Sequence, residues 1–74
     1  MLKIKDNIDL KELEKLDFEF KLNEYFSSPY YVSLHGNVLI WKNSKKLEII
    51  HVTHINDEYD ILFDLIQAGL VEKV

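Results

Sequence analysis

The stretch that decides the fold is DEYDILFDLIQAGLVEKV, residues 57–74. It begins with carboxylates, which the positive end of a helix dipole favours, and Asn56 and Asp57 compete as the residue that caps the helix. Gly69 is a natural stop, because glycine readily adopts the left-handed conformation that ends many helices. An α-helix ending at Gly69 is therefore predicted. For residues 70–74 three alternatives stay open: an edge strand, a cover over the core, or an extension of the helix.

Three surfaces are predicted around this helix. The residues expected to face the core recur at helical spacing and are Tyr59, Leu62, Phe63, Ile66 and Leu70. The residues expected to face water form an acidic stripe, which consists of Asp57, Asp60 and Asp64 and continues into Gln67. A second apolar set lies beside the acidic stripe and is called the apolar flank: Ile61, Leu65 and Ala68.

The apolar flank allows two interpretations. In the first, the N-terminal helix or the N-terminal residues Leu2 and Ile4 pack on it. In the second, it is exposed and forms a homodimer or partner surface, because contiguous exposed apolar residues mark association sites. The candidate interaction residues are thus those of the apolar flank and the acidic stripe.

A second helix is predicted at residues 9–16. The sequence from Asp9 to Glu12 matches a capping box, in which the Asp9 carboxylate accepts from the amide of Glu12 and the Glu12 carboxylate accepts from the amide of Asp9. The apolar residues of this segment recur at helical spacing, and they are Leu10, Leu13 and Leu16.

Four strands are predicted between the helices, at residues 18–22, 30–35, 38–41 and 47–54. In the first strand the alternation places Phe18, Phe20 and Leu22 on one face. Gly36 and Asn37 tolerate positive φ and predict a hairpin between the second and third strands.

Polar residues interrupt the strands on either side of this hairpin. Residues 23–29 contain the chain's single proline and predict a loop, and residues 42–46 predict a second turn. In the last strand the alternation slips at Ile49 and Ile50, so either both faces are partly buried or a bulge changes the register.

These elements predict an α+β fold. We expect residues 1–74 to form a single domain with an antiparallel sheet of three to four strands, packed on one face by an N-terminal and a C-terminal helix. The order is helix, four strands, helix. A chain of 74 residues with 47% apolar and 30% charged residues suits one small core and is not of disordered composition.

Composition excludes several classes of protein. The chain has no cysteine, which rules out a disulfide framework and a thiolate zinc site. Its nine basic residues are all lysine, its formal net charge is −4, and the missing arginine fork disfavours nucleic-acid recognition. No apolar run approaches the roughly 18 residues of a membrane span. We therefore expect a soluble protein of the cytoplasm.

No residue pattern predicts catalysis, a cofactor or a metal. His51 and His54 are three apart on a predicted strand, so their side chains point to opposite faces, and His35 is expected at the surface or rim. The serines lie in no nucleophile elbow. Asp60 and Asp64 share a helix face, but acid–base work needs a cleft that separates their environments.

Two segments carry a resemblance to known proteins: KDNIDLKELEKL, residues 5–16, and YDILFDLIQAGLVEKV, residues 59–74. Together they resemble the ends of small uncharacterised proteins encoded by phages and prophages of low-GC Gram-positive bacteria. Neither segment is catalytic, and no functional residues carry over. The resemblance implies a cytoplasmic, phage-associated accessory protein in a bacterial host cell.

Two functions are expected on these grounds. The first is a non-enzymatic accessory protein that acts through protein–protein interaction or self-association at the apolar flank. The alternative is an acidic inhibitor whose acidic stripe occupies a basic surface of a host protein.

Overall fold

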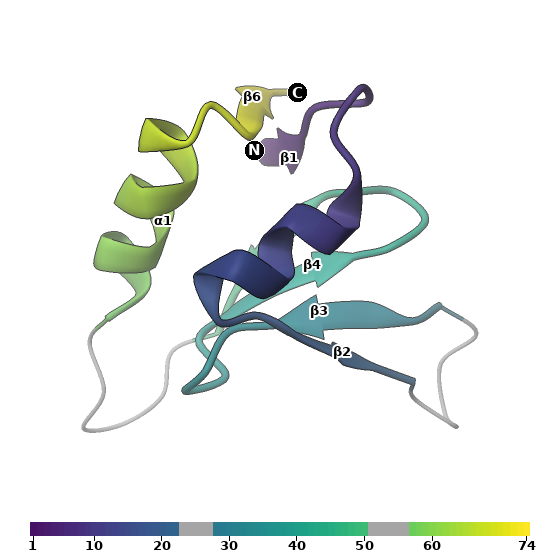
Figure 1. Ribbon diagram of the computed structural model, residues 1–74, viewed down its shortest axis with the longest axis vertical. Coiled ribbons are helices and arrows are strands. Elements are labelled where there is room, and N and C mark those ends of the chain that lie inside the picture. The colour runs from purple at the N-terminus through teal and green to yellow at the C-terminus, as the bar shows by residue number, and fades with distance from the viewer. Residues whose placement is uncertain (23–27, 51–56) are drawn as a thin grey trace.

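The computed structural model describes residues 1–22, 28–50 and 57–74, and Figure 1 shows its ribbon. The described elements follow one another as β1 Leu2–Ile4, the 3₁₀ helix η1 Leu10–Leu16, β2 Glu19–Lys21, β3 Tyr30–Val32, β4 Val38–Trp41, β5 Leu47–Ile49, α1 Glu58–Gln67 and β6 Val71–Lys73. The fold is α+β, with antiparallel sheets and two helices, which is the class predicted from the sequence.

Four strands form one antiparallel sheet in the order β2-β3-β4-β5. The predicted hairpin between β3 and β4 is confirmed, with Tyr31 opposite Ile40. Gly36 turns the chain with φ +79°, and its amide donates to the carbonyl of Ser33 at 2.9 Å. Each strand of this sheet therefore pairs with the strand next to it in the sequence, as local turn signals predict.

A second sheet, which was not predicted, pairs β1 with β6 in antiparallel register, Lys3 opposite Glu72. Residues 70–74 therefore contain an edge strand, one of the three alternatives left open above. Gly69, at φ +70°, ends α1 as predicted. Its amide donates to the carbonyl of Ile66 at 3.0 Å, and the amide of Leu70 donates to the carbonyl of Leu65 at 3.1 Å. This hydrogen-bond pair is a Schellman motif, and it turns the chain from α1 into β6.

The N-terminal helix lies where it was predicted but is a 3₁₀ helix. A 3₁₀ helix has three residues per turn, so the leucines at every third position share one line. Leu13 is fully buried, and Leu10 and Leu16 pack beside it. The predicted capping box is incomplete, because the Asp9 carboxylate accepts from the amide of Lys11 at 3.0 Å. The amide of Glu12 instead donates to the carbonyl of Asp9, also at 3.0 Å.

Three predicted strands are shorter in the described residues. One is β3, which covers only Tyr30–Val32 of the predicted 30–35 because the turn closed by the hydrogen bond from Gly36 begins at Ser33. β2 covers only Glu19–Lys21, and of the three residues expected on its inner face Phe18 is buried while Phe20 and Leu22 are exposed. The reason is that β2 is an edge strand of the sheet.

β5 covers Leu47–Ile49, and both Ile49 and Ile50 are exposed. The remainder of the predicted strand 47–54, most of the predicted loop 23–29, and the histidines at 51 and 54 lie outside the described residues.

The core lies between the four-stranded sheet and the elements that cover it. In Figure 1, η1 and the β1–β6 pair lie above β3 and β2, and α1 stands at the left. The buried cluster takes residues from both sheets and both helices, together with the segments next to them: Ile4, Leu13, Phe18, Tyr31, Val38, Ile40, Leu65 and Leu70. Burial raises the pKa of the Tyr31 hydroxyl above its usual value of 10.0.

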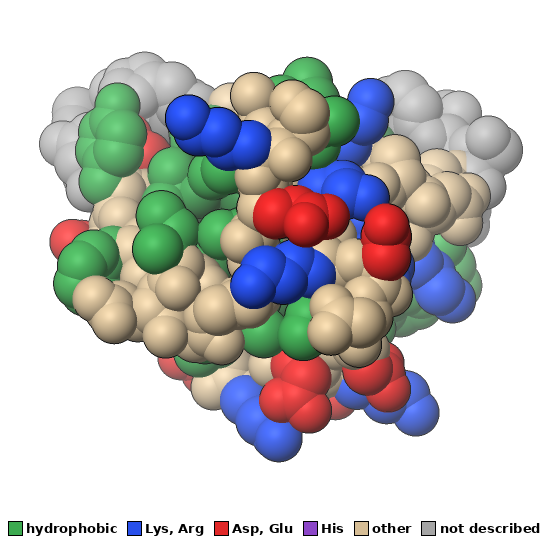
Figure 2. All heavy atoms as spheres, turned by 90° about the horizontal axis from the view of Figure 1, so that it is seen from above, with side chains coloured by type: hydrophobic (Ala, Val, Ile, Leu, Met, Phe, Trp, Pro, Cys, Tyr) green, Lys and Arg blue, Asp and Glu red, His purple; other side chains and the backbone are tan. Residues whose placement is uncertain are grey.

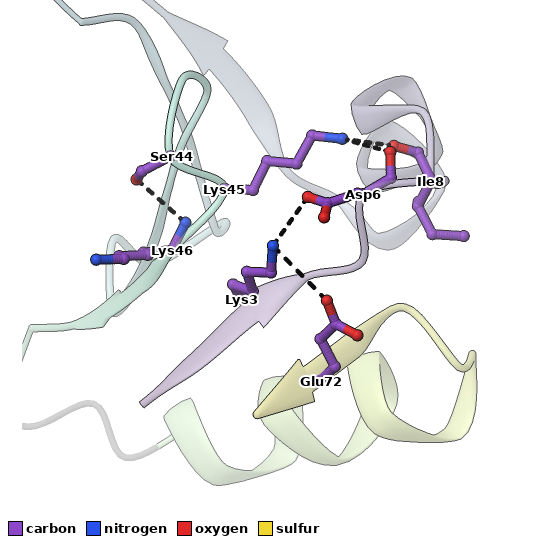
Figure 3. Close-up of polar contacts among 7 residues, drawn as sticks. All are labelled: Lys3, Asp6, Ile8, Ser44, Lys45, Lys46 and Glu72. Carbon is purple, nitrogen blue, oxygen red and sulfur yellow. Dashed lines mark hydrogen bonds and ion pairs between the residues drawn. The ribbon is translucent and has the colours of Figure 1, made fainter. Parts of the chain in front are cut away.

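Lysine side chains join the two sheets (Figure 3). The amide of Ile4 donates to the carbonyl of Lys45 at 2.8 Å, and the Lys45 ammonium donates to the carbonyls of Asp6 and Ile8 at 3.1 and 3.3 Å. Lys3 lies 2.9 Å from the Asp6 carboxylate, and this hydrogen bond raises the pKa of Lys3 and lowers that of Asp6 below 3.8. Lys3 and Lys45 thus help to hold β1 in place.

Candidate interaction surface

Helix α1 is rotated about its axis relative to the prediction. Leu65 has 0% exposed surface, and Ile61 and Leu62 pack against the core. Three residues expected inside are exposed by more than half: Tyr59 at 75%, Phe63 at 58% and Ile66 at 56%. The prediction of the core face was right for Leu62 and Leu70 and wrong for Tyr59, Phe63 and Ile66. These last three residues are called the exposed ridge.

The apolar flank is largely covered, as the first of its two interpretations expects. Leu65 is buried, Ile61 is half-buried and only Ala68 is exposed. Ile4 and Leu13 belong to the same buried cluster as Leu65. This agrees with the alternative in which the N-terminal helix and residues near the N-terminus cover the flank. The surplus apolar surface of α1 exists, but it lies on the exposed ridge.

The physical reason for the rotation lies at the end of the helix. In a Schellman motif the residue after the glycine commonly packs against the residue five positions before it. Here these residues are Leu70 and Leu65, joined by the hydrogen bond described above, and both are buried. The sequence predicts that the helix ends at Gly69, and the pair of leucines at 65 and 70 is the sequence signal that identifies the core face.

Apolar residues cover more than half of the circumference of α1. At about 100° per residue, Tyr59, Phe63 and Ile66 lie within about 60° of one another around the helix axis, and the buried side lies next to them. Figure 2 shows hydrophobic side chains gathered on the left of the molecule, the side on which α1 stands in Figure 1. The core takes up one part of this apolar arc, and the exposed ridge is the remainder.

A polar cluster fixes the start of α1 against the β3–β4 hairpin. Asp57 occupies the N-cap position, but its carboxylate makes no capping hydrogen bond. It accepts instead from the side-chain amide of Asn37 at 2.5 Å and lies 2.6 Å from Nδ1 of His35. The same amide nitrogen of Asn37 lies 3.2 Å from the Glu58 carboxylate. Asn37 and Glu58 are both buried, so this cluster is a structural tie that the sequence did not predict.

The acidic stripe is divided by this cluster. Asp57 is turned toward Asn37 and His35, whereas Asp60 and Asp64 are exposed as predicted. Within the described ranges, Asp60 and Asp64 form no ion pair, and α1 itself contains no lysine. Asp60 is three residues before Phe63 and borders the exposed ridge, whereas Asp64 lies one turn after Asp60 on the side of the helix away from the ridge.

Comparison with known proteins adds no family to these observations. Neither helix in the described part of the chain has the length and apolarity that crossing a membrane requires. Among the described side chains, no group of three or more metal-ligating residues comes together. No protein-family model, curated protein or solved structure matches the chain.

Proposed function

We propose that this chain is a non-enzymatic phage or prophage accessory protein that acts through protein–protein contact or self-association. The exposed ridge of α1 is its contact surface. The single observation that supports this proposal is the exposure of Tyr59, Phe63 and Ile66 on one helix of a small domain. The phage association and the cytoplasm of a bacterial host cell come from the resemblance of the two terminal segments.

The spacing of the exposed ridge suits recognition by a groove. A helix that docks into a groove presents anchors at positions such as i, i+4 and i+7, and Tyr59, Phe63 and Ile66 have this spacing. Aromatic residues supply large contact areas at low entropic cost and dominate the energetics of many interfaces. In the isolated chain these side chains lack the stabilisation that burial away from water provides, and a partner that covers them supplies it.

The test compares the exposed ridge with an equally exposed apolar residue elsewhere. Wild type, a Phe63→Ser/Ile66→Ser variant and a Leu22→Ser control are immobilised, and host proteins that they retain are quantified by mass spectrometry. Sedimentation velocity of the same proteins reports self-association. We expect a retained protein or a dimer that the ridge variant loses and the control keeps. Identical retention and identical sedimentation in all three proteins contradict the proposal.

The acidic inhibitor is the second candidate, and Asp60 and Asp64 favour it because both are exposed and unpaired among the described residues. Asp57 weakens it, since its carboxylate is held by Asn37 and His35. An inhibitor of this kind is expected to lose its partner in an Asp60→Asn/Asp64→Asn variant and at high salt, because exposed charges are screened. It is expected to keep its partner in the ridge variant.

A further inference from the structure

The charges around the exposed ridge specify the chemistry of its partner. Resting on the function proposed above, we infer that the ridge binds a protein surface with an apolar groove rimmed by lysine or arginine, and not a second copy of this chain. The ridge supplies the apolar contact, and the exposed Asp60 beside it supplies the negative charge, together with Asp64 one turn further along the helix.

The sequence contains no lysine between Lys46 and Lys73, whereas the same stretch contains Asp60, Asp64 and four further acids. Two lysines near the junction of the two sheets are already engaged. Lys3 pairs with Asp6 and Glu72, and Lys45 donates to main-chain carbonyls. The exposed ridge is therefore bordered by negative charge along α1 with no cation on that helix to offset it.

This charge distribution disfavours a symmetric dimer. A two-fold interface places the same patch of both copies in contact, so the two ridges would bring together two copies of Asp60 and Asp64. Like charges brought together at an interface oppose binding, whereas lysine or arginine on a partner complements them and raises the rate of encounter. The partner that satisfies both properties of this surface is basic and apolar.

The dimensions of the ridge limit the partner groove. From Tyr59 to Ile66 the helix rises by about 10 Å, so the groove needs sockets for three side chains over that length. A short amphipathic helix with one apolar and one basic face offers this combination. Such a peptide serves as a probe of the required chemistry.

The experiment uses two labelled helical peptides of about 18 residues, long enough for several turns. Both carry leucine at the same positions of one face, and the other positions are lysine in one peptide and glutamate in the other. Fluorescence anisotropy measures their binding to the full chain. We expect the lysine peptide to bind at least about tenfold more tightly, and its affinity to fall severalfold between about 0.05 M and about 0.5 M salt.

Variants locate the binding surface. The affinity for the lysine peptide is expected to fall by about tenfold or more in each of two double variants, Phe63→Ser/Ile66→Ser and Asp60→Asn/Asp64→Asn. The matched controls are Leu22→Ser for the apolar loss and Glu12→Gln/Glu14→Gln on η1 for the same change in net charge. Both controls are expected to bind like wild type. All these side chains are exposed. Far-ultraviolet circular dichroism is used to check that each variant is folded.

Three outcomes overturn the inference. In the first, the lysine and glutamate peptides bind equally well. In the second, the η1 and α1 charge variants lower the affinity for the lysine peptide equally. In the third, the chain forms a dimer that the ridge variant abolishes. The dimer leaves the proposed function intact, because the ridge would still be the contact surface. If the ridge variant changes neither peptide binding, nor protein retention, nor sedimentation, the proposed function fails together with the inference.

Discussion

Replacing Leu65 and Phe63 by alanine in turn tests which side of α1 faces the core. Leu65 has no exposed surface and belongs to the buried cluster. Leu65→Ala removes about three methyl or methylene groups, worth about 2.4 kcal/mol at about 0.8 kcal/mol each. The cavity raises the expected loss in the free energy of unfolding to about 3 kcal/mol. Phe63 is more than half exposed, so Phe63→Ala is expected to cost under about 1 kcal/mol.

Urea denaturation followed through the fluorescence of Trp41, the single tryptophan, measures both changes. With a slope of about 1 kcal/mol per molar urea for a chain of this size, Leu65→Ala is expected to lower the midpoint by about 3 M. The exposed Leu22→Ala serves as the control and is expected to leave the midpoint nearly unchanged. A larger loss for Phe63→Ala than for Leu65→Ala refutes the orientation of the helix and, with it, the exposed ridge.

Three further predictions concern the contacts that hold the fold together. Asn37→Ala is expected to destabilise the protein by about 2–4 kcal/mol, measured by urea denaturation, because it removes a donor from the buried Glu58 carboxylate; an unchanged midpoint contradicts the role of this tie. Asp17 has φ +65°, and a left-handed residue other than glycine costs about 1 kcal/mol. Glycine relieves this strain but also gives the unfolded chain more entropy, so Asp17→Gly is expected to raise the free energy of unfolding by about 0.5 kcal/mol. A lower urea midpoint argues against strain at Asp17. The hydrogen bond from Lys3 lowers the pKa of Asp6, so ionised Asp6 contributes to the free energy of unfolding above about pH 4, and this contribution is lost as the pH falls. Asp6→Asn is expected to remove it, so the urea midpoints of the two proteins should differ near pH 6 and converge near pH 2. A difference that persists in acid contradicts the linkage.

Local patterns predicted the elements that depend on neighbouring residues. Gly36 carries the positive φ of the β3–β4 hairpin, and Gly69 ends α1. The leucines of η1 were found by their spacing, although a strict interval of three suits a 3₁₀ helix better than an α-helix. These features lie within a few residues of the side chains that cause them, so the sequence alone reveals them.

Contacts between segments that are distant in the sequence cannot be predicted from local patterns. The strands β1 and β6 are three residues each and pair across almost the whole chain, with Leu2 opposite Lys73. Short strands of this kind have too few residues to show a period. The tie between Asn37 and Glu58 likewise joins residues that are distant in sequence. Both contacts fix where α1 lies, and neither leaves a local signal.

The candidate site was predicted in kind and misplaced in position. The sequence showed that α1 carries more apolar surface than one core face requires, but helical spacing alone does not tell which part of a wide apolar arc is buried. The Schellman contact between Leu65 and Leu70 decides it in the structure. The residues available to a partner are therefore Tyr59, Phe63 and Ile66, and not Leu65.

Hydroxyl-radical footprinting tests the central claim most directly, because it reports the exposure of individual side chains with and without a partner. The rates of oxidation of Tyr59, Phe63 and Leu65 are each divided by the rate of the same residue in the urea-unfolded chain. We predict that Tyr59 and Phe63 react readily in the free protein and become protected by the lysine peptide, while Leu65 is protected in both states. Rapid oxidation of Leu65, or an exposed ridge that no binding partner protects, would contradict the account.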